Sequence, residues 1–133
     1  MKKEKNSFEK NKYLSDKGIR PRISVIIASS NNAEHIGECL DSILSQPFTE
    51  IEVIVVDVLS TDGTKDLVAE TAREDDRVVF LADGYASLGR ARNIGMDHAR
   101  APYIVFVEPE DYIDGDMLGY LYREMEEIGR AHV

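Results

Sequence analysis

The sequence has little of several features that mark particular classes of protein. It contains a single cysteine, Cys39, and no tryptophan. One cysteine cannot form a disulfide within the chain or a metal site of several thiolates, so a reducing compartment is expected. No apolar run resembles the core of a secretory leader or approaches the roughly 20 residues of a membrane-spanning helix. We therefore expect a cytoplasmic protein without a membrane span, with the inner membrane surface as the alternative location.

Charge is distributed unevenly along the chain, whose formal net charge is -9. Residues 1–22 contain eight Lys or Arg against three Asp or Glu, and the remainder contains eight against twenty-two. Because so acidic a body repels phosphate backbones, nucleic acid is not an expected partner. The basic segment 1–22 is polar and without period, which predicts a disordered tail.

Short apolar runs alternate with stretches whose apolar residues recur at helical spacing. The runs that predict strands are 23–27, 51–56, 78–82 and 103–107, and the stretches that predict helices are 36–44, 64–74, 88–100 and one from about 117. Strands joined by helices over short connections must be parallel, with right-handed crossovers. We therefore predict an α/β fold with an open, doubly wound, mostly parallel sheet, in one domain over residues 23–126.

Polar side chains gather where each predicted strand ends. These positions are Ser29–Asn32, Asp57–Asp62, Asp83–Ser87 and Glu108–Asp111. In an open parallel sheet, ligands bind beyond the carboxyl ends of the strands. We also expect all four helices to begin at that edge, where their positive ends favour a phosphate-bearing ligand.

Three motifs occur in order along the chain. They are SVIIASSNNAEHIGECLDSILSQ, then IEVIVVDVLSTDGT, then LGRARNIGMDHARAPYIVFVEPEDYI. Together they resemble the nucleotide-sugar-binding half of family-two glycosyltransferases with the GT-A fold, over about residues 23–126. The resemblance implies a hexosyltransferase that moves a sugar from a nucleotide diphosphate, expected to be a UDP-sugar, to a glycan or lipid-linked acceptor in cell-surface polysaccharide biosynthesis.

The resemblance also implies where the nucleobase binds. In the family a turn after the first strand holds the base, and Ser29, Ser30 and Asn31 occupy that turn here. The family's aromatic residue, which stacks on the base, is replaced by Ser30, and Tyr85 is a candidate substitute. The alternative role of Asn31 is that of a helix N-cap, because Glu34 follows at capping-box spacing.

Two further segments are expected to contact the donor by the same resemblance. Asp57 is expected to accept the N–H of a uracil-like base, although Val58 and Leu59 replace the second aspartate and the glycine that the family has next. Arg92 and Asn93 match the family's Ala-Arg-Asn segment, and Arg92 is expected to pair with the diphosphate or to brace the acidic residues after the fourth strand.

Those acidic residues are Glu108, Glu110 and Asp111, at the family's Asp-x-Asp motif. The resemblance implies that they bind Mg²⁺ or Mn²⁺, which would neutralise charge on the departing nucleoside diphosphate. Both principal aspartates are glutamates here, and we expect Pro109 to favour a turn in which the two glutamates converge. A solvated acidic turn without a metal is the alternative.

The family's catalytic base lies well after the metal motif, so we expect it beyond residue 133 and expect this fragment alone to be inactive. Residues 127–133, EIGRAHV, resemble the translation of a sequencing adapter, which predicts an artefactual tail on a truncated chain. A non-catalytic GT-A-like nucleotide-binding or scaffold module with a degenerate metal motif is the alternative function.

Overall fold

A computed structural model describes residues 20–84 and 87–131. The elements of this part alternate as predicted: β1 (Ile23–Ser29), α2 (Ile36–Leu44), β2 (Ile51–Val58), α3 (Thr64–Glu74), β3 (Val78–Asp83), α4 (Leu88–His98), β4 (Tyr103–Phe106) and α5 (Met117–Ala131). β1 and β2 each continue two residues beyond their predicted ends. Most of the predicted tail 1–22, and Tyr85, lie outside the described residues. None of the described helices is long and apolar enough to cross a membrane.

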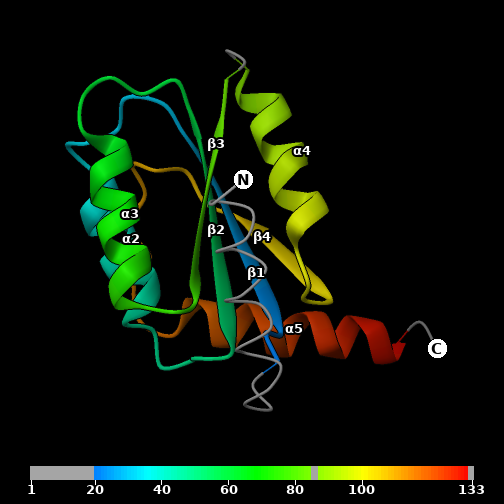
Figure 1. Cartoon of the computed structure of the whole chain (residues 1–133). Helices are drawn as coiled ribbons and strands as arrows, with labels where there is room; N and C mark the ends of the chain where they lie inside the picture. Colours follow the sequence, from blue (N-terminus) through cyan, green and yellow to red (C-terminus); the bar gives the residue numbers. More distant parts are fainter. Residues whose placement is uncertain (1–19, 85–86, 132–133) are drawn as a thin grey trace.

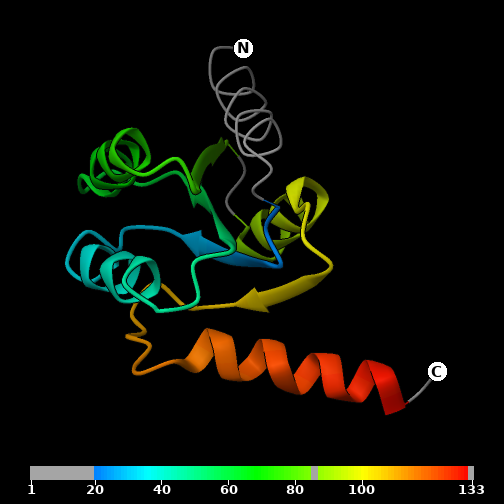
Figure 2. The ribbon, with the colours of Figure 1, turned by 90° about the horizontal axis from the view of Figure 1, so that it is seen from below.

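The four strands form one parallel sheet in the order β3-β2-β1-β4. β1 and β2 occupy its centre, and every residue of both strands is buried. Helices α2 and α3 cover one face and α4 covers the other (Figure 1; Figure 2). The continuous apolar runs therefore belong to strands packed on both sides, as expected for a parallel sheet. The predicted open, doubly wound α/β sheet is confirmed.

Alternate residues of the central strands supply two separate cores. Val25 and Val53 belong to the core beneath α2 and α3. Ile54 and Val56 belong to the core beneath α4, whose Ala91 is fully buried. At 20 to 33 cal/mol per Å² of apolar surface, burial in these cores is the main force that holds the helices on the sheet.

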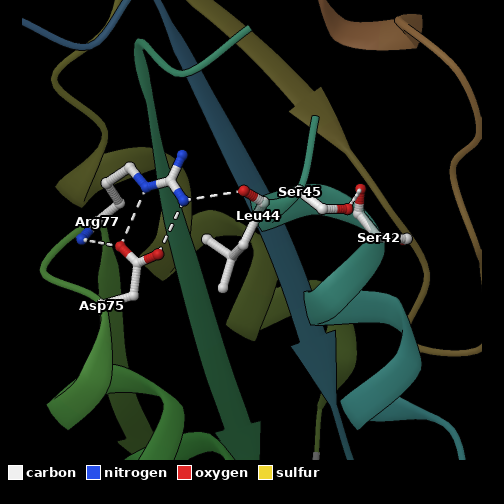
Figure 3. Close-up of polar contacts among 5 residues, drawn as sticks. All are labelled: Ser42, Leu44, Ser45, Asp75 and Arg77. Carbon is white, nitrogen blue, oxygen red and sulfur yellow. Dashed lines mark hydrogen bonds and ion pairs between the residues drawn. The ribbon is translucent and has the colours of Figure 1, made fainter. Parts of the chain in front are cut away.

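The carboxyl end of α2 is held by a contact from a distant turn. The Arg77 guanidinium donates to the Leu44 carbonyl at 3.0 Å, and it also pairs with Asp75 at 2.8 Å (Figure 3). An arginine is suited to this place, because the last carbonyls of a helix lack partners and carry partial negative charge. The contact ties the end of α2 to the turn between α3 and β3.

Helix α5 begins near the predicted residue, at Met117, but it does not begin at the predicted edge of the sheet. Residues 107–116 follow β4 and run beside α2, where Ile113 N–H donates to Ser42 at 3.1 Å. Leu118 N–H then donates to Gln46, just after the end of α2. The start of α5 thus lies at the amino end of the sheet, and α5 crosses the sheet at its β4 side (Figure 2). The expectation that all four helices begin at the carboxyl edge is wrong for α5.

Two tyrosines fix α5 in that position. The hydroxyls of Tyr103 on β4 and Tyr122 on α5 both donate to Glu126, at 2.7 and 2.9 Å. Tyr122 also accepts a 2.7 Å hydrogen bond from Arg22 and packs on Phe48, with ring centroids 5.2 Å apart.

Residues 127–131 of the predicted artefactual tail continue this helix. Their artefactual origin stays a prediction.

In the part of the chain that the structure describes, two residues other than glycine have left-handed backbone, and both lie in loops at the carboxyl edge. Asn31 has φ 55° and Leu59 has φ 51°. Asn31 is therefore not the N-cap of α2, which begins five residues later without a side-chain cap. Leu59 occupies the position where the family has glycine, a residue that adopts this conformation without strain.

We predict that Leu59→Gly raises the free energy of unfolding by about 0.5 to 1 kcal/mol, because relief of the left-handed strain exceeds the extra chain entropy of glycine. Little packing is lost, since Leu59 is 48% exposed. Leu59→Ala is the matched control: it keeps a Cβ and should not stabilise the protein. Urea unfolding followed by circular dichroism measures both variants. A less stable glycine variant would show that Leu59 is not strained.

We predict that Gly95→Ala lowers the free energy of unfolding by about 1 to 2 kcal/mol, despite the better helix propensity of alanine. A Cβ at Gly95 on α4 would lie 2.6 Å from Cγ2 of Ile26, a buried residue of β1. Gly37→Ala on α2 is the control, because a Cβ there meets nothing within 4 Å. The same unfolding experiment should show Gly37→Ala unchanged or slightly more stable, and equal stabilities would contradict close packing of α4.

Candidate functional site

Asp57 lies at the end of β2 and is the centre of the hydrogen bonding at the carboxyl edge. Its side chain is fully buried. Oδ1 accepts from the hydroxyls of Ser29 and Ser60 at 2.8 and 2.6 Å, and Oδ2 accepts from Ser60 N–H at 3.1 Å. A buried carboxylate needs such donors, since leaving it without them costs several kcal/mol. The predicted contact of Asp57 with a nucleobase would need an exposed oxygen, and Asp57 exposes none.

The loop after β1 and the loop after β2 are joined to one another by further hydrogen bonds. Asn31 donates its N–H to Ser60 Oγ at 2.8 Å, and its Oδ1 accepts from Thr61 N–H at 2.8 Å. Ser30 Oγ donates to the Val58 carbonyl at 2.8 Å, and Asn32 N–H donates to Thr64 Oγ1 at 2.9 Å. The two loops thus form one interlocked surface. Asn31, Thr61 and Leu59 face solvent on it.

Asp62 makes a further link between the loops. It accepts from Ala33 N–H at 3.0 Å and from both the N–H and the hydroxyl of Thr64. The Thr64 hydroxyl is the main cause that lowers the pKa of Asp62, and the backbone donors add to it. Gly63 occupies the N-cap position of α3, and Asp62 before it accepts the N–H of Thr64 at the start of the helix while also binding the neighbouring loop.

The acidic segment after β4 completes the edge. Arg92 on α4 pairs with Glu108 at 3.1 Å, so the predicted bracing role of Arg92 is present in the structure. Glu110 accepts from Asn32 Nδ2 at 2.9 Å, which joins the acidic segment to the loop after β1. Asn93 is exposed on α4. The loop after β1, helix α4 and the acidic segment after β4 therefore meet at this edge, although they are far apart in sequence.

Glu108, Glu110 and Asp111 do not gather as the metal motif predicted. Asp111 closes a turn, in which it accepts from Glu108 N–H at 3.1 Å and donates its own N–H to the Glu108 carbonyl at 2.9 Å. Glu108 and Glu110 instead hydrogen-bond to different elements. Among residues 20–84 and 87–131, no group of three or more Asp, Glu, His or Cys could hold a metal ion. The expected convergence of Glu108 and Glu110 stays a prediction.

The exposed glutamates still offer hard oxygen donors. A Mg²⁺ or Mn²⁺ ion commonly takes only one or two carboxylates and completes its shell with water and substrate phosphates. Glu110 and Glu108 fit that requirement, because their side chains are exposed and hydrogen-bonded at one oxygen each. A cation held by these two glutamates would need further oxygens from water or from a ligand.

Cys39 lies beneath the acidic segment. Its Sγ is 3.5 Å from the Glu108 carbonyl oxygen. Burial, and then the negative charges of Asp111 and Glu110, raise the pKa of Cys39 to about 12. The thiol is therefore neutral at physiological pH and serves as a packing residue of α2.

Two residues that make side-chain contacts at this edge, Asp83 and Ser60, were not identified from the sequence. Asp83, at the end of β3, is buried and pairs with Arg90 of α4 at 3.2 Å. Ser60 hydrogen-bonds to both Asp57 and Asn31. The available signal was position, because Asp83 is the last residue of β3 and Ser60 lies two residues after the end of β2, both at the carboxyl edge.

Known proteins resemble this chain in sequence. The model of the family described as Glycosyl transferase family 2 matches residues 24–133. The glycosyltransferase GlyA of Streptococcus pneumoniae serotype 4 is 33% identical over 106 residues, which cover 80% of this chain and 15% of GlyA.

Two solved structures resemble the chain in fold and also share 26% or more of its aligned sequence. TarS of S. aureus, residues 1–349 in complex with UDP-GlcNAc, has a TM-score of 0.72 and 32% identity, covering 80% of this chain and 31% of that one. A TarS of Staphylococcus aureus is named a poly(ribitol-phosphate) beta-N-acetylglucosaminyltransferase. The mannosyltransferase PcManGT of Pyrobaculum calidifontis, in complex with GDP-Man and Mn²⁺, has a TM-score of 0.67 and 26% identity, covering 83% and 35%.

The chain thus spans 15% of the length of GlyA, 31% of the TarS chain and 35% of the PcManGT chain. In each comparison most of this chain is covered, and the two solved structures share its fold. The chain belongs to glycosyl transferase family 2.

Proposed function

We propose that this chain is the donor-binding part of a glycosyltransferase that takes a hexosyl group from a UDP-sugar. The observation that supports it most is the interlocked surface of the loops after β1 and β2, with Arg92 beside it, at the sheet edge where parallel folds bind ligands. TarS binds UDP-GlcNAc on the same fold. The nucleobase would lie against Ser30, Asn31 and the loop that follows Asp57, above Ser29.

The phosphates would lie nearer α4. Arg92 sits in the first turns of that helix, whose N–H groups point to the carboxyl edge. A guanidinium there can pair with diphosphate oxygens in a two-pronged geometry, and the helix N-terminus favours negative charge. Asn93 is exposed beside Arg92 and would donate an amide N–H to the same group.

A divalent cation would be held by Glu110 and Glu108 together with the donor's diphosphate. When bound, it would neutralise charge on the leaving nucleoside diphosphate. Glu108 would have to share or give up its ion pair with Arg92, which frees the guanidinium for phosphate. PcManGT, which has the same fold, is known in complex with Mn²⁺.

The remaining parts of the reaction would come from outside these 133 residues. We propose that the acceptor site and the carboxylate base are supplied there, and that the acceptor is a glycan or a lipid-linked saccharide of the cell surface. The polymer acceptor in the name of TarS supports the first class. Such acceptors would place the reaction in the cytoplasm at the inner membrane surface.

A second candidate is a non-catalytic nucleotide-binding or scaffold module. Two observations favour it: Arg92 already neutralises Glu108, and the described residues contain no cluster of three acids that could hold a metal. The two candidates share the donor surface and differ in the cation. Metal-dependent strengthening of nucleotide binding therefore separates them.

We predict that UDP binds this chain and that Arg92→Ala weakens binding about tenfold or more, because a charge-assisted hydrogen bond to phosphate contributes about 1.5 to 3 kcal/mol. Arg73→Ala is the matched control, since Arg73 is exposed in the last turn of α3, away from this edge. Isothermal titration calorimetry with UDP measures both. No binding to the unaltered chain, or equal binding by both variants, contradicts the donor site.

We predict that Mn²⁺ strengthens UDP binding and that Glu110→Gln removes most of this gain, because the amide oxygen is a weaker ligand for a hard cation than a carboxylate. The control is Glu70→Gln, at an exposed position on α3. UDP titrations with and without Mn²⁺ give the ratio of affinities for each variant. A ratio of one in the unaltered chain supports the scaffold module instead.

A further inference from the structure

We propose that Asp57 is a positioning residue for the nucleobase: it holds the two base-side loops in place through Ser60 and does not contact the base. This inference rests on the proposed donor site and deepens it. It changes the role that the family resemblance implies for Asp57, which is direct acceptance of the base N–H.

The first reason is access. Asp57 has 0% of its surface exposed, and its three hydrogen bonds all come from within the chain. Ser29 lies opposite Asp57 in the pairing of β1 with β2, and Ser60 follows three residues later. Both hydroxyls point at Oδ1, so the carboxylate is enclosed from the β1 side and from its own loop.

The second reason is the chain of contacts that leads from Asp57 to the exposed surface. Asn31 N–H donates to Ser60 Oγ at 2.8 Å, and Ser60 Oγ in turn donates to Asp57 Oδ1 at 2.6 Å. Hydrogen bonds in series to a buried charge strengthen one another. Asp57 therefore fixes the Ser60 hydroxyl, and that hydroxyl fixes the backbone of Asn31.

The third reason is conformational. The two loops that Asp57 joins contain Asn31 and Leu59, the two described residues other than glycine that have left-handed backbone. Such residues persist only where surrounding contacts hold them. Ser60 adjoins Leu59 and donates its own N–H to Asp57 Oδ2 at 3.1 Å, and it accepts from Asn31. The carboxylate thus keeps both loops in the shape that presents Asn31 and Thr61 to a ligand.

The inference gives two measurable consequences, the first without any nucleotide. Ser60→Ala removes the link between Asp57 and Asn31, so the Asn31 amide should exchange with solvent about tenfold faster or more. Ser60→Thr keeps a hydroxyl and should restore slow exchange. Exchange is read by NMR on the 133-residue chain, with circular dichroism to show that each variant is folded. Unchanged exchange in Ser60→Ala overturns the inference.

The second consequence concerns the base. Asp57→Asn and Ser60→Ala should each weaken UDP about tenfold, and should weaken the N3-methylated analogue of UDP, which has no N–H there, by the same factor. Direct acceptance by Asp57 predicts instead that Asp57→Asn weakens UDP and leaves the methylated analogue unchanged. Calorimetric titration of both nucleotides decides between them, and Ser60→Ala keeps the test available if Asp57→Asn unfolds.

The possible results are distinguishable. Faster exchange with equal losses for both nucleotides supports the inference. Faster exchange with a loss confined to UDP overturns it and leaves the donor site standing. If the unaltered chain binds neither nucleotide, the proposed function fails, and with it the role of Asp57 toward a base, whatever the exchange rates show.

Discussion

The parallel pairing of β1 with β2 is the constraint on which the rest of the structure depends. The register sets Ile23 opposite Ile51 and Ser29 opposite Asp57, so both strands end at the same level. Because both are buried on both faces, a slip by one residue would move each apolar side chain into the opposite core. This pairing therefore decides which polar residues of the two following loops can meet.

A charged side chain buried at the end of such a strand must then receive its hydrogen bonds from other groups of the protein. Asp57 is enclosed by helices and loops, and its carboxylate requires hydrogen-bond donors. The register supplies Ser29 from one side, and the turn after β2 supplies Ser60 from the other. Satisfying this one buried group consequently shapes both loops. The surface that faces a ligand is a result of that requirement and of the contacts between Asn31 and Thr61.

The sequence predicted the strands and the helices of the sheet well, because burial on two faces leaves unbroken apolar runs and burial on one face leaves a helical period. It did not predict the position of α5, since residues 107–116 have no period and their path is set by contacts with Ser42 and Gln46. It placed Arg92 beside the acidic segment correctly. The ion pair of Asp83 with Arg90 and the burial of Asp57 depend on side-chain direction at strand ends, which residue type does not encode.

The acidic segment has glutamate at both principal positions of the family's metal motif. Glu108 pairs with Arg92, and Glu110 accepts a hydrogen bond from Asn32. Each glutamate thereby has a neutralising or donating partner without a cation. Under the proposed function, a cation would compete with the Arg92 guanidinium for Glu108, and a diphosphate that both can bind would favour the cation. Cation binding and donor binding would then be coupled, because the diphosphate would be the partner that Arg92 and the cation share.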